Sequence, residues 1–515
     1  MKKTILFLGV IAMISSCKPE PADVNEYANT ITSDELKEKL YTYASDEFEG
    51  RETGQPGQKK AVEYLKNHYV NLDIPSPIAE GDYFQEVPLQ TIGTPNVELT
   101  VNGKTFNYFD DLVSLNGAPS ATLDATDIVY AGYGINTEEY NDYENLDVTG
   151  KIVVIKEGEP QNADGTYLIS GTKENSVWSN GRQALTPKRE AAKEKGAAAV
   201  FFMSNDLFPR YSAGYKRIAE SGGSNRLSIV GGEAPIHHFM INENLGKALV
   251  KNINSSNTGA IVNSKVSLNY EAVTTQVGSE NVAAVLKGTE KPDEYIIISS
   301  HLDHIGISAD GQINNGADDD GSGSVAVLEI AEAFKAAAEK GHGPKRSILF
   351  LHVTGEEKGL LGSQYYADFD PIVPLENTVV DLNIDMIGRI DPKRESDNRD
   401  YVYLIGADKL SSELHNISEE INSKYTNLEL DYTYNDENHP DRIYYRSDHW
   451  SFAKNNIPII FYFNGTHDDY HRPSDTPDKI EYDLLENRTR LVFYTAWELA
   501  NRENRIVVDK VSAIE

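Results

Sequence analysis

Short apolar runs alternate with helical stretches from residue 275 onward, and this pattern constrains the fold more than any other feature of the chain. The runs are EYIIISSH (294–301), RSILFLHV (346–353), TVVDLNI (378–384) and IPIIFYF (457–463). A strongly helical segment, SVAVLEIAEAFKAAAEKG, separates the first two. Strands that are apolar at every position are buried on both faces, as in parallel sheets covered by helices on either side. The chain is therefore predicted to have an α/β fold, with a mixed, largely parallel sheet and helices on both faces.

Polar residues follow the apolar runs, at the points where the strands would end. They are His301 and Asp303, Glu356 and Glu357, Asp385, and His471. Ligands of such sheets bind just past the carboxyl ends of the strands, so these side chains are expected to meet at one edge. Each residue alone has a simpler explanation, such as a hydrogen-bonded surface histidine or a solvated acid. Their shared position after the strands favours a common site instead.

The segment NNGADDDGSG (314–323) places Asp318, Asp319 and Asp320 side by side, just ahead of a helical segment. Such a run of acids is either a solvated surface turn or part of a cation site, and a helix N-terminus favours nearby negative charge. Two histidines and three carboxylates at the same sheet edge suit two divalent ions that share one carboxylate. Zinc accepts this mixture of nitrogen and oxygen ligands. The sequence therefore favours the cation site.

The ordered motifs HLDHIG, GADDDGSG, GEEKGLLGS, NIDMIG and YHRPSDT span the second half of the chain. This set resembles the co-catalytic zinc exopeptidases, which include bacterial leucyl aminopeptidase and aminopeptidase Y and, more distantly, glutamate carboxypeptidase and the transferrin receptor. The likeness covers residues 275–485, and SDEFEGRETGQPGQKKAVEYL near the start also fits. The resemblance implies two zinc ions per chain. Their ligands would be His301 and Asp385 for one ion, Glu357 and His471 for the other, and Asp319 as the bridge.

The resemblance also implies roles in catalysis. Glu356, next to a ligand but not one itself, would be the general base and acid that serves the attacking water and the leaving amine. Tyr470 would stabilise the oxyanion, and Arg446 would contact the substrate or the intermediate; both could instead pack or pair structurally. Asp303 would orient the His301 imidazole. Asp320, joined to Asp319 by a cis peptide in the related enzymes, would shape the loop, and His352 is expected to be a buried, hydrogen-bonded histidine.

An aminopeptidase acting on peptides is the first hypothesis for the activity. A carboxypeptidase or dipeptidase of the same fold is the alternative, because Arg446 would suit a substrate carboxylate. Glutaminyl cyclases share the fold but use one zinc, and the five ligand positions present here count against them. A non-catalytic binding protein like the transferrin receptor would have lost zinc ligands, and no such loss is seen. The formal charge of −32 argues against nucleic acid as a partner, since its phosphates would be repelled.

The N-terminus predicts export. A positive MKK, an apolar TILFLGVIAMI and a short SSC resemble the signal peptide of bacterial lipoproteins, here residues 1–17, in which the lipobox cysteine, Cys17, is lipidated and becomes the mature N-terminus. An ordinary cleaved signal is the alternative. Cys17 is the chain's one cysteine, so an internal disulfide and a thiolate zinc site are both excluded. We expect a tether over 18–30 and a cell-envelope protein, facing the periplasm or the cell surface, that touches the membrane through its lipid anchor alone.

Three further segments are predicted. Residues 31–119 would form the first part of the catalytic domain, beginning with a helix whose Thr32 and Glu35 have capping-box spacing. Residues 120–265 would form a β-rich α+β insert, because AGYGINTEEYNDYENLDVTGKIVVI (131–155) resembles the protease-associated domain. Residues 266–515 would complete the catalytic domain. Nothing in the sequence specifies the oligomeric state.

Overall fold

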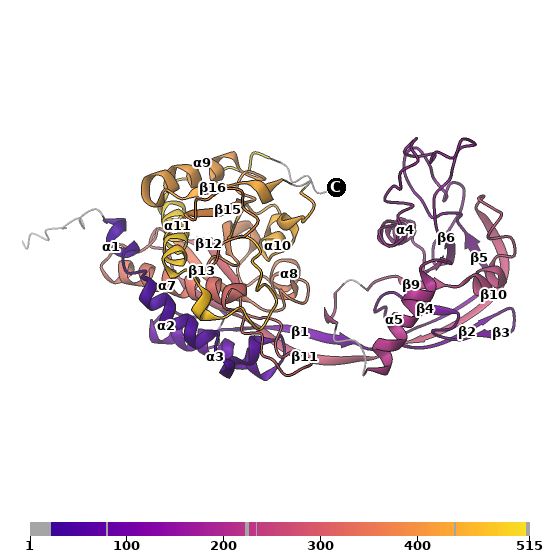
Figure 1. Cartoon of the computed structure of the whole chain (residues 1–515), viewed down its shortest axis with the longest axis horizontal. Coiled ribbons are helices and arrows are strands. Elements are labelled where there is room, and N and C mark those ends of the chain that lie inside the picture. The colour runs from indigo at the N-terminus through magenta and orange to yellow at the C-terminus, as the bar shows by residue number, and fades with distance from the viewer. Residues whose placement is uncertain (1–21, 79–80, 222–225, 233, 437–438, 511–515) are drawn as a thin grey trace, which may run out of the picture. The chain divides into compact units, whose positions relative to one another are not determined.

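The computed structural model describes residues 22–78, 81–221, 226–232, 234–436 and 439–510. It contains two compact units, one formed by residues up to 87 and from 278 onward and the other by residues 88–277 (Figure 1). The second unit is wider at both ends than the predicted insert of 120–265. The difference arises because the strands between residues 96 and 114, and the end of the strand that runs to residue 271, pair within the sheet of the second unit.

The first unit is built on a mixed sheet whose strand order is β16-β15-β17-β14-β12-β13-β11-β1. Its central strands β13, β12, β14 and β17 are parallel, while β11 and β15 run antiparallel to their inner neighbours. The bounds are β1 Phe84–Ile92, β11 Thr274–Leu286, β12 Lys291–His301, β13 Arg346–Val353, β14 Thr378–Ile384, β15 Tyr401–Ile405, β16 Glu429–Asp431 and β17 Ile459–Phe463. The predicted α/β fold is confirmed, and the four apolar runs are its parallel strands.

Helices cover both faces of this sheet (Figure 1). Along β12, Ile296 and Ile298 point into one apolar cluster and Ile297 into the other, as the two-residue period of a strand requires. The first cluster includes residues of α2 Ser33–Tyr43, α3 Pro56–Asn71, α7 Gly323–Glu339, α9 Ser412–Ile421 and α11 Tyr482–Asn501; the second includes residues of α8 Leu361–Asp368 and α10 His449–Ala453. Both faces of the sheet are therefore covered by apolar side chains, and polar functional residues can gather only at the ends of the strands.

The start of the described chain is a packed helix, where a tether had been predicted over 18–30. Helix α1 (Val24–Ala28) buries Tyr27, whose ring stacks on Trp497 with centroids 5.7 Å apart. The Tyr27 hydroxyl lies 2.6 Å from His342 Nδ1. Residues 22–30 thus belong to the first unit rather than to a solvated linker. Cys17 and the signal segment lie outside the described residues, and the lipid anchor stays a prediction. Among the described helices, none has the length and apolar character needed to cross a membrane.

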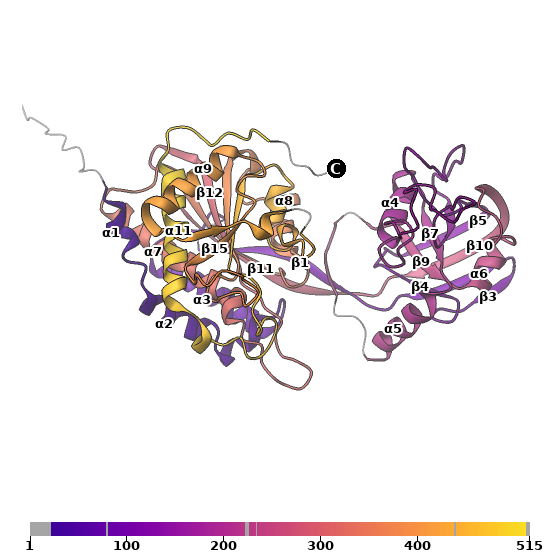
Figure 2. The ribbon, with the colours of Figure 1, turned by 45° about the horizontal axis from the view of Figure 1, so that its top comes forward.

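The second unit has its own sheet, with strand order β3-β2-β10-β5-β6-β7-β9-β4 (Figure 2). Strands β5, β6, β7 and β9 are parallel, and β2, β3, β4 and β10 pair antiparallel. Helices α4 and α5 contribute to the apolar cluster on one face, and α6 contributes to the other. The bounds are β2 Asn96–Val101, β3 Lys104–Phe106, β4 Leu112–Ser114, β5 Ala121–Tyr130, β6 Ile152–Lys156, α4 Leu185–Glu194, β7 Ala199–Met203, α5 Phe208–Glu220, β8 Leu227–Ile229 (paired with β1), β9 His237–Ile241, α6 Glu243–Leu249 and β10 Ala260–Glu271.

The middle of β14 carries a buried carboxyl that should make stability depend on pH. Asp381 is fully buried, Ser299 Oγ donates to its Oδ1 at 2.7 Å, and its Oδ2 has no hydrogen bond among the described residues. Burial raises the pKa of this carboxyl well above its usual range, against the opposing hydrogen bond. The folded protein therefore binds a proton that the unfolded chain releases above pH ~4, and stability falls as pH rises from there towards the folded pKa.

We expect Asp381→Asn to remove this dependence. The stability of the variant relative to the wild type should grow with pH, by up to about 1.4 kcal/mol per pH unit while the buried acid stays protonated. Urea unfolding of both metal-free proteins between pH 5 and 8 measures it. Asp293→Asn, at the exposed start of β12, controls for the Asp-to-Asn change itself. A stability difference that is constant across this range would contradict the prediction.

Candidate metal centre

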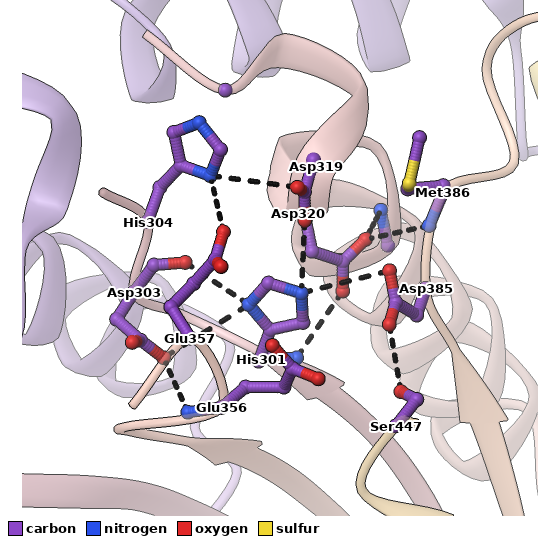
Figure 3. Close-up of polar contacts among 12 residues, drawn as sticks. His301, Asp303, His304, Asp319, Asp320, Glu356, Glu357, Asp385, Met386 and Ser447 are labelled. Atoms are coloured by element: carbon purple, nitrogen blue, oxygen red, sulfur yellow. Dashed lines mark hydrogen bonds and ion pairs between the residues drawn. The ribbon is translucent and has the colours of Figure 1, made fainter. Parts of the chain in front are cut away.

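The ends of the parallel strands bring the five predicted ligands together. Four of them, His301, Asp319, Glu357 and Asp385, are shown in Figure 3. His301 ends β12, Glu357 follows β13, and Asp385 follows β14. Asp319 lies in the turn Ala317–Ser322 ahead of α7, and His471 lies in the loop after β17. The sheet thus places ligands from five separate segments at one edge, which is the arrangement that its parallel order favours.

Asp319 lies between two halves of the site. Its Oδ1 is 3.2 Å from His301 Nε2, which is in turn 3.5 Å from Asp385 Oδ1. Its Oδ2 is 3.1 Å from His471 Nε2, which is 3.0 Å from Glu357 Oε2. One carboxylate therefore presents one oxygen to each half, as a bridging ligand would.

These residues fit divalent cations. His301 Nε2, Asp319 Oδ2 and Glu357 Oε1 are buried, and none makes a hydrogen bond to the described residues. Leaving such atoms unsatisfied is costly, so a buried set of this kind calls for a ligand. Imidazole nitrogens and carboxylate oxygens together are a donor set that zinc accepts. Two groups of potential ligand atoms, each within 4.8 Å of one another, share Asp319: His301 with Asp385, and His304 with Glu357.

His304 is the residue that sequence reasoning missed. It stands in the same HLDHIG motif as His301 but received no role. The structure buries its ring and places Nδ1 2.8 Å from Glu357 Oε1 and 3.7 Å from Asp319 Oδ2 (Figure 3). The available signal was a second histidine at the same strand end, three residues after the first.

Asp303 orients His301 through a different atom from the one predicted. His301 Nδ1 donates to the backbone carbonyl of Asp303 at 3.0 Å, while the nearest oxygen of the Asp303 carboxylate is 3.9 Å away. This bond fixes the tautomer and leaves Nε2 free to face Asp319 and Asp385. The carboxylate instead accepts from Thr53 Oγ1 at 2.7 Å and from the backbone N–H of Glu356 at 3.1 Å. Asp303 therefore links the loops after β12 and β13.

The other two acids of the DDD run build the loop around Asp319. Asp320 accepts from the backbone N–H groups of His301 at 3.2 Å and Met386 at 3.1 Å, which joins the turn to the ends of β12 and β14. Asp318 accepts from the N–H of Gly388 at 2.7 Å. The Asp319–Asp320 peptide is cis, as the resemblance implied. One acid of the run thus faces the site, and its neighbours are held by backbone donors.

The three predicted catalytic side chains line one cavity of about 550 Å³ beside the ligands. Glu356, Arg446 and Tyr470 contribute to it, and they also line a smaller pocket that reaches Asp319 and Asp385. Tyr470 stacks on His471 with ring centroids 3.8 Å apart. Burial, with nearby acids adding, raises the pKa of the Tyr470 hydroxyl, so it stays a donor at neutral pH. Arg446 is exposed, and its side chain has no partner among the described residues.

The histidine expected to be buried in β13 is where the sequence predicted it. His352 is fully buried, with Nδ1 2.9 Å from Ser300 Oγ and Nε2 2.8 Å from the Tyr69 hydroxyl. Both ring nitrogens of His352 thus have hydrogen-bond partners inside the fold, and His352 is not one of the proposed metal ligands.

The second half of the chain is similar to a known family. Residues 281–496 match the model of peptidase family M28. A probable leucine aminopeptidase 2 of Aspergillus oryzae is 27% identical over 57% of this chain and 49% of its own length. A probable glutamate carboxypeptidase, LAMP1, of Arabidopsis thaliana is 31% identical over 23% of this chain and 16% of its own length. Aminopeptidase YwaD of Bacillus subtilis is 30% identical over 24% of this chain and 25% of its own length. The chain thus spans about half or less of the length of these relatives.

Among solved structures, an aminopeptidase from Aneurinibacillus sp. strain AM-1 aligns over 95% of this chain and 98% of its own, with a TM-score of 0.48 and 20% identity. A zinc aminopeptidase from Bacillus subtilis aligns over 93% and 99%, with a TM-score of 0.46 and 19% identity.

Proposed function

We propose that this protein is a zinc aminopeptidase of peptidase family M28, the family whose model matches residues 281–496, and that it binds two ions and removes N-terminal residues from peptides. The observation that carries the proposal is the Asp319 carboxylate, whose two oxygens face His301 and His471 in separate halves of the site, beside buried nitrogen and oxygen atoms that no group among the described residues satisfies. His301 and Asp385 would hold one ion, and Glu357 and His471 the other. When bound, the ions would supply Lewis-acid polarisation of the scissile carbonyl and acidify a water.

Glu356 moves the protons of the reaction. Its carboxylate lines the cavity beside the ligands and accepts the proton of the attacking water, then gives it to the nitrogen of the leaving amine. The backbone N–H of Glu356 is fixed on Asp303, so the side chain starts from a set position. Burial and the acids around it raise the pKa of Glu356 well above its usual range, opposed by His301.

Tyr470 and Arg446 act on the substrate. The Tyr470 hydroxyl is a protonated donor at the cavity wall, so it serves the oxygen that becomes negative in the tetrahedral intermediate. Arg446 has no ion pair to break among the described residues, and its guanidinium is free to contact the peptide. The packing or pairing role left open for it in the sequence has no supporting contact.

The names of the relatives favour an aminopeptidase over a carboxypeptidase. Glu357, Asp319 and Asp385 would be neutralised by the ions that they hold. The charged side chains of the pockets that no ion would hold are therefore Glu356, Arg446 and Lys454. Two of the relatives compared above bear the name aminopeptidase and one the name carboxypeptidase. A carboxypeptidase or dipeptidase that uses Arg446 is the second candidate.

The second unit is proposed to be a protease-associated insert of the M28 domain. It leaves the first unit at residue 87 and returns at 278. Its AGYG motif wraps around Asp142, whose carboxylate accepts from the N–H groups of Tyr133 and Ile135 at 3.1 Å and from the Tyr140 hydroxyl at 2.8 Å. A Cβ at Gly132 would lie 2.4 Å from Asp142 Oδ1, which explains the glycine.

One experiment separates the candidate activities. The purified zinc-loaded protein is incubated with a peptide pool in free and N-acetylated forms, and the products are followed by mass spectrometry. Stepwise loss of N-terminal residues from the free pool alone is the expected result, because acetylation removes the ammonium group. C-terminal trimming of both pools would replace the proposal by a carboxypeptidase with Arg446 as its recognition residue. No cleavage of either pool, with two ions bound, would overturn peptide hydrolysis.

A further inference from the structure

The two halves of the site are unequal in histidines. On the side of His301 and Asp385, one imidazole faces Asp319. On the side of Glu357, two imidazoles approach, from His471 and from His304. The rings of these two histidines lie 5.7 Å apart between centroids, at 70° to one another. The extra histidine is the feature of the site that the proposed ligand set leaves unused.

The His304 ring points at the ligands rather than at a structural partner. The close-up shows it facing Glu357 and Asp319 (Figure 3). Its Nδ1 is 2.8 Å from Glu357 Oε1 and 3.7 Å from Asp319 Oδ2. The ring is fully buried, and neither of its nitrogens makes a hydrogen bond among the described residues. A buried imidazole with both nitrogens unsatisfied is unusual, since buried polar side chains nearly always have a partner.

A plain hydrogen bond between His304 and Glu357 is the competing explanation. The distance alone would allow it, but Nδ1 and Oε1 do not meet the alignment of donor and acceptor. Two atoms that bind the same tetrahedral zinc at about 2.0–2.1 Å lie about 3.3 Å apart. The separations from His304 Nδ1 and from His471 Nε2 to the facing oxygens range from 2.8 to 3.7 Å and lie around this value.

The neighbouring loops are shaped to hold the ring in this place. A Cβ at Gly316 would lie 2.6 Å from both Cγ and Cδ2 of His304, so the loop passes directly over the ring. Buried Arg51 fastens both segments: its backbone carbonyl accepts from the N–H of His304 at 3.3 Å, and its guanidinium donates to the Gly316 carbonyl at 2.9 Å. Two distant parts of the chain, at Arg51 and at Gly316, therefore fix the position of His304.

We propose that His304 is a further protein ligand, through Nδ1, of the ion held by Glu357 and His471, with Asp319 shared between the ions. The inference rests on the proposed two-ion function. It gives that ion two imidazoles and two carboxylates, while the other ion has one imidazole and two carboxylates. Nitrogen-rich sites favour zinc and its neighbours over hard cations, so the two positions should differ in the metals that they accept.

Metal binding without turnover tests the proposal. Ion content is measured by elemental analysis, and affinity by titration against a chelator, for the wild type, His304→Ala and His471→Ala. Loss of a group that only orients a ligand typically weakens binding about 10- to 100-fold. We expect His304→Ala to weaken one of the two ions by more than that, as His471→Ala does, and to leave the other unchanged. His68→Gln, a histidine on α3 paired with Glu332, is the matched control and should bind both ions normally.

A spectroscopic count of imidazoles makes the test independent of affinity. In the cobalt-substituted protein, each coordinating histidine gives a strongly shifted, exchangeable N–H proton resonance. The wild type should show three such resonances, from His301, His304 and His471, and His304→Gln should show two. Two resonances in the wild type, or unchanged binding of both ions by the His304 variants, would overturn the assignment while leaving the two-ion function intact. A wild type that binds fewer than two ions would overturn the proposed function and this inference together.

Discussion

Replacing Glu356 with glutamine is expected to lower kcat by about 10²- to 10⁴-fold while both ions stay bound. Glutamine has nearly the same shape as glutamate and keeps the backbone N–H that bonds to Asp303. It cannot take a proton from water, and it cannot return one to the leaving amine. The loss should therefore appear in kcat, with KM changed little. Steady-state kinetics on a free peptide and elemental analysis of the same samples measure the two parts of this prediction.

Two controls isolate the proton-transfer role. Glu413→Gln changes an acid in a surface ion pair with Arg502, outside the site, and should leave kcat at the wild-type value. Glu357→Gln changes the neighbouring acid, which faces His471 and His304, and should release an ion as well as lower activity. Wild-type turnover by Glu356→Gln would remove Glu356 from the mechanism. Loss of an ion in that variant would instead make Glu356 a ligand.

The predictable part of the fold was the part determined by local pattern. Runs such as YIII (295–298) and ILFL (348–351) are apolar at every position, as is typical of a strand buried on both faces. The helix that follows Thr32 was also predictable, from the spacing of Thr32 and Glu35. In the structure, Thr32 Oγ1 accepts a hydrogen bond from the backbone N–H of Glu35 and donates one to the Glu35 carboxylate. The strand ends then located the site, since a parallel sheet gathers them at one edge.

The extent of the second unit depended on pairing between distant segments. Strand β2 pairs with β10, as in Leu99 with Leu268. The alternation of apolar and polar residues along β2 is compatible with either of the two sheets, so it does not say which sheet the strand joins. The packed helix at Val24–Ala28 is too short for a periodic signal, and its stability comes from contacts such as that of Tyr27 with Trp497. Long-range contacts of this kind leave no mark within a short window of sequence.

His304 escaped prediction for a geometric reason. Strand β12 ends at His301, and beyond that residue the alternation of a strand no longer says where a side chain points. The direction of the His304 ring is set by Arg51 and by the loop at Gly316. Asp303 shows the same limit, because the orienting group proved to be its carbonyl rather than its carboxylate. The conformation of the loop after β12 sets both the direction of the His304 ring and the group of Asp303 that contacts His301. Local sequence pattern constrains the conformation of such a loop only weakly.

Replacing Asp319 with alanine is expected to remove both ions and all measurable turnover. The two oxygens of this one carboxylate face different halves of the site, with His301 3.2 Å from Oδ1 and His471 3.1 Å from Oδ2. Its loss therefore weakens both positions at once. Asp385→Ala and Glu357→Ala each remove a ligand from one half and should each cost one ion. Elemental analysis of the variants after identical zinc loading gives the comparison.

Thermal unfolding supplies a second measure of the same effect. An ion that binds only the folded chain raises its stability by an amount that grows with the ratio of free ion to dissociation constant, about 2.7 kcal/mol at a hundredfold excess. Zinc should therefore raise the Tm of the wild type and of Asp310→Ala, which alters an exposed acid just before the same loop. It should leave Asp319→Ala nearly unchanged. If Asp319→Ala kept one ion at wild-type affinity, the halves would bind independently, and the bridging role that unites them would be wrong.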